Sequence, residues 1–220
     1  MVSTHQLAEI PLLASLSEDE RVKLAGLMKE RRVPKGSYIV YEQDSAPSIM
    51  FLAKGRAKVT LVSDDDKEII LYNYCKGDVF GELAVLTGAD RSANVVASTE
   101  CRLYSLGAKE FIRHIHENCG FALALMTELA QRLQAASAKI ADLALYDVYR
   151  RVARTLKSMA TATEVNGEEV FMIDERPTHS ELSKMVGTSR EMVTRALKGL
   201  EEDGCIVVDD QSIEVRKLPV

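Results

Sequence analysis

The chain is poor in the residues that build catalytic and metal-binding sites. Its four cysteines are scattered, without a C-x-x-C pair or a histidine at zinc-finger spacing, so zinc and iron–sulfur sites are poorly supported. We expect these cysteines to be small, mostly buried thiols. The four histidines are equally dispersed, and His114 and His116 would face different ways on a helix. We therefore expect no catalytic residue, no bound metal, no tightly bound cofactor and no enzymatic activity.

Long apolar segments are also missing. No stretch approaches the roughly 18 consecutive apolar residues that a membrane span needs, and the opening residues MVSTHQLAEI lack the basic and apolar regions of a secretion signal. The chain has 46% hydrophobic and 28% charged residues, which is typical of a soluble globular protein. We expect a cytoplasmic protein without a membrane partner, large enough at 220 residues for one large domain or two ordinary ones.

The chain has no overall excess of positive charge. Its formal net charge of −5 argues against a general polyanion binder. A local basic patch is nevertheless sufficient to bind phosphates, and residues 189–198 carry three basic side chains against one acidic side chain. Positive charge is therefore concentrated in this segment.

The middle of the chain has the pattern of an antiparallel β domain. Short runs rich in β-branched and aromatic residues alternate with turn formers such as Pro34-Lys35-Gly36. These runs predict strands at 37–42, 49–53, 56–62, 68–73, 93–98 and 101–106. Before them, residues 7–32 have the pattern of short helices, one of them capped by Ser17. Many short strands with regular turns predict a sandwich or barrel-like roll.

A long amphipathic helix follows the β region. Apolar residues recur at alternating steps of three and four, at Met126, Leu129, Leu133, Ala136, Ile140 and Leu143. Such a seam can pack on the chain's own β domain, but it is longer than one compact domain readily covers. We therefore favour self-association through this helix and expect a homodimer.

The segment 177–204 has the pattern of a helix-turn-helix. Thr178 is a natural N-cap for the first helix, Gly187 suits the turn, and Ser189 caps the second helix. Around this segment we expect a helix at 148–160, a small β element turning at Asn166-Gly167, and a final hairpin at 204–218. A helix-turn-helix followed by a β hairpin is the winged-helix arrangement.

The second of these helices presents a polar face. Its outward side chains are expected to be Arg190, Glu191, Thr194, Arg195 and Lys198. Arginine can donate two hydrogen bonds to guanine, and glutamate can accept one from the cytosine amino group. An ordinary exposed helix with a Glu191–Arg195 ion pair would show the same spacing. The turn, the buried stripe and the polar face are all typical of a recognition helix. We therefore favour binding to double-stranded DNA over an ordinary exposed helix.

Residues 80–97 interrupt the strand pattern with a candidate anion site. The run Gly81-Glu82-Leu83-Ala84 predicts a short helical turn, and Arg91-Ser92 follows before the strands resume. Backbone N–H groups after a glycine suit an anion. Arg91 and Ser92 can bind a phosphate, and Glu82 can accept from sugar hydroxyls. The alternative is a capped surface turn with an Arg–Glu salt bridge.

The run Ser189-Arg190-Glu191-Met192-Val193-Thr194-Arg195 resembles the recognition-helix signature of the CRP/FNR superfamily, in its catabolite activator branch. The resemblance covers nearly the whole chain and implies a bacterial transcription regulator that binds a TGTGA-like inverted repeat and RNA polymerase. It implies base contacts from both arginines and the glutamate, and a phosphate contact from Thr178. His179 stands beside it in place of the activator's arginine. The DNA-binding set is thus Thr178, His179, Ser189, Arg190, Glu191 and Arg195.

Residues 80–97 are similar to the phosphate-binding cassette of cyclic-nucleotide-binding domains. The resemblance places Glu82 at the ribose and Arg91-Ser92 at the cyclic phosphate, and Arg132 matches a residue near the base. Ala136 and Ser137 match a Thr-Ser pair that reads adenine in the activator, and alanine has no hydroxyl for that contact. The ligand-binding set is Gly81, Glu82, Leu83, Ala84, Arg91, Ser92, Arg132, Ala136 and Ser137.

Cyclic AMP is the favoured effector, and the alternatives are cyclic GMP, cyclic di-GMP or activity without ligand. A redox or haem sensor of the same superfamily is less favoured, because clustered N-terminal cysteines are absent. We expect an α+β fold with a β-roll effector-binding domain at 1–118, a dimerisation helix at 119–146 and a winged helix-turn-helix DNA-binding domain at 147–220.

Overall fold

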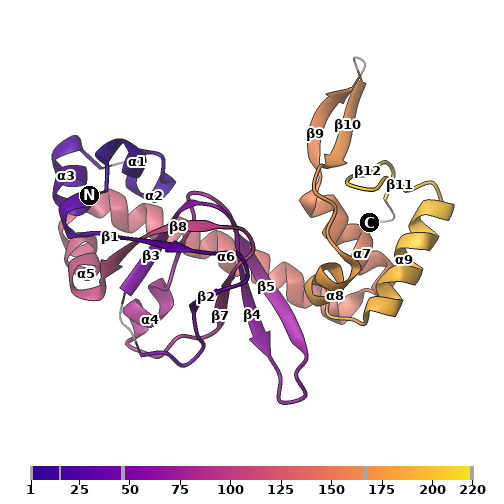
Figure 1. The fold of residues 1–220 in the computed structure, drawn as a ribbon, viewed down its shortest axis with the longest axis horizontal. Coiled ribbons are helices and arrows are strands. Elements are labelled where there is room, and N and C mark those ends of the chain that lie inside the picture. Colours follow the sequence, from indigo (N-terminus) through magenta and orange to yellow (C-terminus); the bar gives the residue numbers. More distant parts are fainter. Residues whose placement is uncertain (1, 15, 46–47, 166–167, 219–220) are drawn as a thin grey trace. The chain divides into compact units, whose positions relative to one another are not determined.

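The computed structural model describes residues 2–14, 16–45, 48–165 and 168–218. The chain forms two compact units, Met1–Arg132 and Leu133–Val220, and their boundary falls inside the long helix α6 (Cys119–Leu145). No helix among the described residues is long and apolar enough to cross a membrane. The predicted α+β class, with antiparallel sheets, a long helix and a C-terminal helix-turn-helix, is confirmed (Figure 1).

The first unit contains two four-stranded antiparallel sheets, of order β1-β8-β3-β6 and β2-β7-β4-β5. Their strands are β1 (Lys29–Val33), β2 (Tyr38–Val40), β3 (Ser48–Lys54), β4 (Ala57–Val62), β5 (Glu68–Tyr74), β6 (Val79–Phe80), β7 (Asn94–Ala97) and β8 (Cys101–Gly107). All six predicted strands are present. The expectation of helix up to residue 32 is wrong, because Lys29–Val33 pairs with β8 as an edge strand.

Strand β3 shows how the sheets are stabilised, because it is buried on both faces. Met50 and Leu52 belong to a core that contains residues of both sheets, among them Val95 and Leu103. Ile49 and Phe51, on the other face, belong to a core shared with the helices. Each fully buried aliphatic or aromatic side chain contributes about 1.5–3 kcal/mol. The two cores fix the sheets against each other and the helices against the first sheet.

Helices complete the first unit and lie together on the same side of the strands (Figure 1). They are α1 (Thr4–Ala8), α2 (Pro11–Ala14), α3 (Glu18–Leu27), α5 (Ala108–Glu117) and the start of α6, while α4 (Glu82–Thr87) follows β6. The predicted cap at Ser17 is confirmed, because Ser17 and Glu20 form a capping box. Glu20 also accepts from the Asn118 amide at 2.8 Å, which ties α3 to the junction of α5 and α6.

Helix α6 leaves most of its predicted apolar seam in contact with solvent. Leu133 is 69% exposed and Ile140 is 67% exposed, and Met126 and Leu143 are exposed as well. Of the seam residues, only Leu129 packs against the core that β3 shares with the helices through Ile49 and Phe51. The single chain therefore presents a long apolar stripe that its own described residues do not cover.

The second unit has the winged-helix arrangement. After α6 it contains α7 (Val148–Met159), β9 (Thr161–Val165), β10 (Glu168–Ile173), α8 (His179–Val186), α9 (Arg190–Glu202), β11 (Ile206–Val208) and β12 (Ile213–Val215). Its sheet has the order β11-β12-β10-β9, and its core joins α7, α8 and α9 through residues such as Val152, Leu182 and Val193. Strands β9 and β10 pair as predicted, and the Asn166-Gly167 turn lies outside the described residues.

The expectation that the cysteines are mostly buried is wrong for two of the four. Cys101 is buried and Cys205 is half-buried, but Cys75 and Cys119 are exposed. Cys75 follows the end of β5 and Cys119 begins α6, so both occupy element ends.

Candidate functional site

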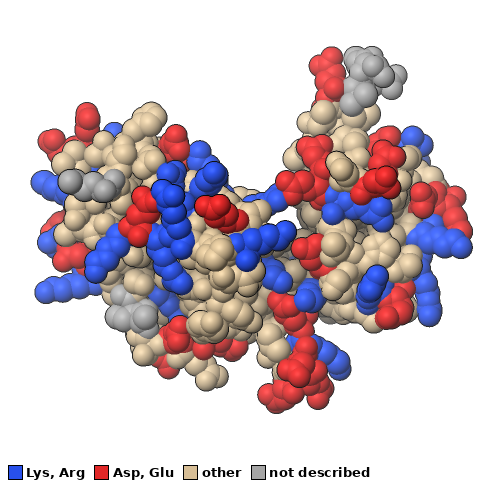
Figure 2. All heavy atoms as spheres, in the orientation of Figure 1, with Lys and Arg blue, Asp and Glu red and all other residues tan. Residues whose placement is uncertain are grey.

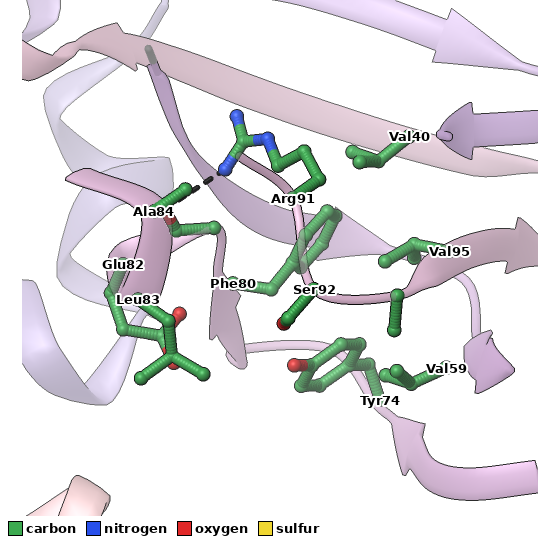
Figure 3. A pocket seen from close by; sticks show the side chains of 12 residues that line it. Val40, Val59, Tyr74, Phe80, Glu82, Leu83, Ala84, Arg91, Ser92 and Val95 are labelled. Carbon is green, nitrogen blue, oxygen red and sulfur yellow. Dashed lines mark hydrogen bonds between the residues drawn. The ribbon is translucent and has the colours of Figure 1, made fainter. Parts of the chain in front are cut away.

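A pocket lies where α4 meets the second sheet. Figure 3 shows Glu82, Leu83 and Ala84 on one side and Val40, Val59 and Val95 on the other. The pocket is lined by Val40, Val59, Tyr74, Phe80, Gly81, Glu82, Leu83, Ala84, Arg91, Ser92, Ala93 and Val95. All six residues that were expected from segment 80–97 are therefore brought together. The apolar lining from the sheets was not predicted.

Gly81 begins α4 with a backbone conformation that favours glycine. Its φ is +87°, in the left-handed region. A Cβ atom added there would lie 2.3 Å from Arg91 Nη1 and 2.9 Å from the Ser48 carbonyl oxygen. Glycine is thus required both for the turn into α4 and for the close approach of Arg91.

Arg91 is the buried cation of the pocket, with an exposed fraction of 5%. Its Nη1 donates to the Gly81 carbonyl at 2.9 Å, the bond drawn in Figure 3, and its Nη2 donates to the Ser48 carbonyl at 2.5 Å. Its backbone N–H donates to Asp44 at 3.1 Å. Burial lowers the pKa of the guanidinium, because loss of water disfavours the charged form. Arg91 is therefore held inside the pocket, although Leu83 and residues 86–90 of the same segment are exposed.

Glu82 is buried with only half of its carboxylate paired. The side chain is 3% exposed, and Oε1 accepts from Arg132 Nη1 at 3.0 Å. Among the described residues, Oε2 is buried without a hydrogen-bond partner. An unsatisfied buried acceptor is costly, and more so when it is charged. Oε2 is therefore suited to accept from a donor that enters the pocket.

Arg132 connects α6 to the pocket. Its Nη2 donates to the Val79 carbonyl of β6 and to Glu128, and its guanidinium lies over the ring of Tyr74 at 5.1 Å. Tyr74 stacks in turn on Phe80, with ring centroids 5.0 Å apart. Burial raises the pKa of Tyr74, so the phenol stays neutral. Glu128 and Tyr74 were not predicted, although the i,i+4 spacing of Glu128 and Arg132 was visible.

Ala136 and Ser137 belong to the second unit, unlike the other candidate ligand residues. Both are exposed on α6, and the Ser137 hydroxyl donates to the Leu133 carbonyl at 2.9 Å. Their part in ligand binding stays a prediction.

The helix-turn-helix places its capping residues as predicted. Thr178 and Glu181 form a capping box at the start of α8, in which the Thr178 hydroxyl accepts from the Glu181 N–H at 3.1 Å and the Glu181 carboxylate accepts from the Thr178 N–H at 3.0 Å. Gly187 ends α8 with a φ of +67°. The Ser189 hydroxyl caps α9 by accepting from the Met192 N–H at 3.3 Å. The hydroxyls of Thr178 and Ser189 thus have structural partners within the motif.

Helix α9 exposes the candidate base-reading residues and buries the expected stripe. Arg190, Glu191 and Arg195 are exposed, while Val193 and Leu197 are buried. Hydrogen bonds from its own N–H and from Ser189 lower the pKa of Glu191, so its carboxylate is charged at neutral pH. Figure 2 shows acidic and basic side chains interspersed over the visible face of the molecule. On this face (Figure 2), neither sign of charge forms an extended surface.

His179 is the first residue of α8, and its imidazole ring contacts both α9 and the segment before α8. Its Nδ1 is 2.8 Å from the Thr194 hydroxyl, and its Nε2 is 3.4 Å from Arg176 Nη2. Burial lowers the pKa of His179, and the positive charges of Arg176 and Arg190 lower it further. The ring is therefore neutral at pH 7.

Comparison with known proteins identifies domain families and relatives that this chain resembles. The cyclic nucleotide-binding domain family matches residues 30–118, and the Crp-like helix-turn-helix domain family matches residues 150–219. The chain is 32% identical over 201 residues to the cAMP-activated global transcriptional regulator Vfr of Pseudomonas aeruginosa, covering 88% of this chain and 92% of that protein. It is also 32% identical over 189 residues to the cAMP-activated global transcriptional regulator CRP of Salmonella typhimurium, covering 84% and 88%.

Solved structures agree in fold. The regulator CLP of Xanthomonas campestris, described as responsive to cyclic di-GMP, has a TM-score of 0.75 at 24% identity, covering 87% of this chain and 95% of that chain. A CooA mutant of Carboxydothermus hydrogenoformans has a TM-score of 0.79 at 20% identity, covering 95% and 91%. At these identities the likeness shows the fold alone.

Proposed function

The chain belongs to the CRP/FNR family of transcription regulators, and from this premise we propose that it is a homodimer whose sequence-specific DNA binding is controlled by a cyclic nucleotide, with cyclic AMP favoured. The proposed division is a β-roll effector-binding domain at 1–118, a dimerisation helix at 119–146 and a winged helix-turn-helix at 147–220. The proposed setting is the bacterial cytoplasm, with RNA polymerase as a protein partner.

The unpaired Oε2 of Glu82 is the observation that carries the ligand proposal. A ribose 2′-hydroxyl can donate to this oxygen without displacing Arg132 from Oε1. The buried Arg91 supplies the positive charge for a cyclic phosphate, which would replace its contact with the Gly81 or the Ser48 carbonyl, and Ser92 supplies a hydroxyl donor. Together these groups match a sugar joined to an anionic phosphate.

Selection of the base is the less specified part of the proposal. Ala136 lacks the hydroxyl that would accept from or donate to a base, which removes a contact worth about 0.5–1.5 kcal/mol. Phosphate and ribose contacts are unaffected by this loss, so selectivity falls more than affinity. Cyclic GMP, cyclic di-GMP and ligand-independent DNA binding are therefore the alternatives. A haem or redox sensor is the remaining one, and visible absorption bands in the purified protein would support it.

The exposed stripe of α6 supports the dimer. Pairing with a second copy would remove Leu133 and Ile140 from water, which the single chain does not achieve. Ligand binding would then favour a state in which the two α9 helices lie about 34 Å apart, one DNA turn. A ligand has this effect only when it binds that state more tightly than the other.

The DNA side of the proposal assigns roles to the exposed residues of the second unit. Arg190, Glu191 and Arg195 would contact base edges of a TGTGA-like inverted repeat, and Thr178, His179 and Ser189 would lie near the phosphates. Each good base contact is worth about 1–3 kcal/mol of discrimination.

Calorimetry of the purified full-length protein against cyclic AMP, cyclic GMP and cyclic di-GMP tests the ligand. We expect tightest binding of cyclic AMP, and higher affinity for DNA in its presence. Equal DNA affinity with and without all three nucleotides would remove ligand control from the proposal.

Arg190→Ala tests the DNA interface, with Lys198→Ala as its matched control on the same exposed helix. The first variant should lose sequence-specific retardation of DNA but keep its oligomeric state, because Arg190 is exposed. The second should keep sequence-specific retardation, because Lys198 is exposed on α9, pairs with Glu202 and is not among the residues assigned to DNA. Unchanged operator binding by Arg190→Ala would contradict the assignment of α9.

A further inference from the structure

Arg176 connects the segment before α8 to the β11–β12 turn, which we call the wing turn (residues 209–212). Its backbone N–H donates to the Gln211 carbonyl at 2.8 Å, and its Nη1 donates to the Asp209 carbonyl at 2.9 Å. The side chain is half-buried there. Arg176 is thus held to the wing turn at two points, by main chain and by side chain.

The same guanidinium fixes the direction of the hydrogen bonds that follow. Arginine has only donors, so at 3.4 Å from Arg176 Nη2 the His179 Nε2 must be the acceptor. In a neutral ring the proton is then on Nδ1, which donates to the Thr194 hydroxyl at 2.8 Å. Because the Thr194 oxygen accepts this hydrogen bond, its own hydroxyl hydrogen is available to donate to the Arg190 carbonyl, 3.0 Å away. Every bond in this series has a defined donor.

The series ends at the part of α9 where position matters most. Arg190 is the first residue of the helix, and the first turn of a recognition helix reaches the floor of the major groove. The Thr194 hydroxyl accepts from His179 and donates its only hydrogen to the Arg190 carbonyl. Hydrogen bonds to bases are therefore left to the neighbouring exposed side chains. A small rotation of this turn would misplace bidentate contacts to base edges.

We propose that Arg176, His179 and Thr194 are positioning residues that hold the first turn of α9 in register with the wing turn, with His179 as the neutral Nδ1–H tautomer. The proposal rests on the proposed DNA-reading function. It gives His179 a role within the protein in addition to any phosphate contact. Loss of the series reduces specific DNA binding, which needs correctly placed base contacts, more than non-specific binding, which depends on phosphate charge.

The tautomer of His179 is measured first, because it does not depend on DNA. The full-length protein is labelled with ¹⁵N-histidine, and the His179 signals are identified among the four histidines by their loss in His179→Gln. We expect protonation at Nδ1 at pH 7.5, although histidine in water favours protonation at Nε2. Protonation of His179 at Nε2 in the wild-type protein would overturn the proposal.

Thr194→Val and Thr194→Ser form the matched pair for function. Valine keeps the shape of threonine without the hydroxyl, and serine keeps the hydroxyl, so both should fold, which thermal unfolding checks. The DNA probe is a duplex that the wild-type protein enriches from a random pool, compared with an unselected duplex. We expect Thr194→Val to lower the ratio of specific to non-specific affinity about 2- to 10-fold, the size of one net hydrogen bond. The proton stays on His179 Nδ1, because Arg176 still donates to Nε2, but the Nδ1–H signal shifts, because it loses its acceptor. Thr194→Ser should retain both the affinity ratio and the position of this signal.

The failure of this inference is distinguishable from failure of the proposed function. Wild-type and Thr194→Val proteins with the same affinity ratio, or with the same chemical shift of the His179 Nδ1–H, would overturn the positioning role and leave DNA reading intact. Failure of the wild-type protein to enrich any duplex would overturn DNA reading itself, and the positioning role with it.

Discussion

At the scale of single residues, one guanidinium serves two carboxylates beside the pocket. Arg132 pairs with Glu82 at 3.0 Å and also with Glu128 on its own helix. Burial raises the pKa of Glu128, with Arg132 opposing this effect. Glu82 therefore shares its positive partner, and its second oxygen depends on an incoming donor for compensation.

Glu82→Gln tests the carboxylate while keeping the shape of the side chain. We expect it to weaken cyclic AMP binding by about 1–1.5 kcal/mol, because a hydrogen bond to a charged acceptor is replaced by a weaker one to a neutral amide. Calorimetry against Glu117→Gln, an exposed glutamate at the end of α5, provides the comparison. Equal affinity of the two variants would show that Glu82 does not hold the ribose.

Gly81→Ala, compared with Gly88→Ala, separates the left-handed backbone conformation at Gly81 from the close approach of Arg91 to this residue. Alanine at a left-handed position lowers the free energy of unfolding by about 1–2 kcal/mol. Gly88→Ala is the control for this backbone effect, because Gly88 has a φ of +71° and an added Cβ would meet no other atom within 4 Å. We expect both variants to unfold at lower temperature, and only Gly81→Ala to lose nucleotide affinity, since its Cβ displaces Arg91. Nucleotide binding by Gly81→Ala at the level of Gly88→Ala would contradict this contact.

At the scale of elements, the sequence predicts the strands and helix caps whose formation depends mainly on residues close together in the chain. The strands with alternating or continuous apolar residues were predicted, as were the caps at Ser17, Thr178 and Ser189. Strand β1 was missed because KERRV buries only Val33, so its pairing with β8 and not its own pattern makes it a strand. The two-residue β6 is too short for any pattern.

The double substitution Leu133→Glu and Ile140→Glu tests the stripe of α6. Both side chains are exposed in the single chain, so the fold of each unit should persist, while four carboxylates in a dimer would face an apolar interface. Sedimentation equilibrium should show monomers in place of dimers. Gln131→Glu, exposed on the same helix, is the control. A double variant that remains dimeric would place the interface elsewhere.

At the scale of the whole molecule, the candidate ligand and DNA sites draw on residues far apart in the chain. Arg91 reaches the Ser48 carbonyl across 43 positions, and His179 reaches Thr194 across two helices. Such contacts depend on tertiary packing, which explains why segment 80–97 was assigned as a site from its own sequence whereas Tyr74, Ser48 and Arg176 were not. The family resemblance supplied Arg132, which lies 50 positions from its partner Glu82.

Thermodynamic coupling gives a prediction for the full-length protein. If cyclic AMP raises operator affinity by some factor, operator DNA must raise cyclic AMP affinity by the same factor. We expect this equality in paired titrations, performed with and without the second ligand at one salt concentration. Unequal factors would indicate that one of the titrations does not report a binding equilibrium.

The distribution of thiols has a practical consequence. Cys119 is exposed at the first residue of α6, Cys101 is buried and Cys205 is half-buried, so replacement of Cys75 by serine leaves Cys119 as the most accessible attachment point for a maleimide dye or a nitroxide spin label. In a symmetric dimer each copy would carry one identical label at the start of the same helix. Dipolar spectroscopy between the two labels would then report the spacing of the paired helices directly, with and without nucleotide, and without altering the pocket or the DNA-reading surface.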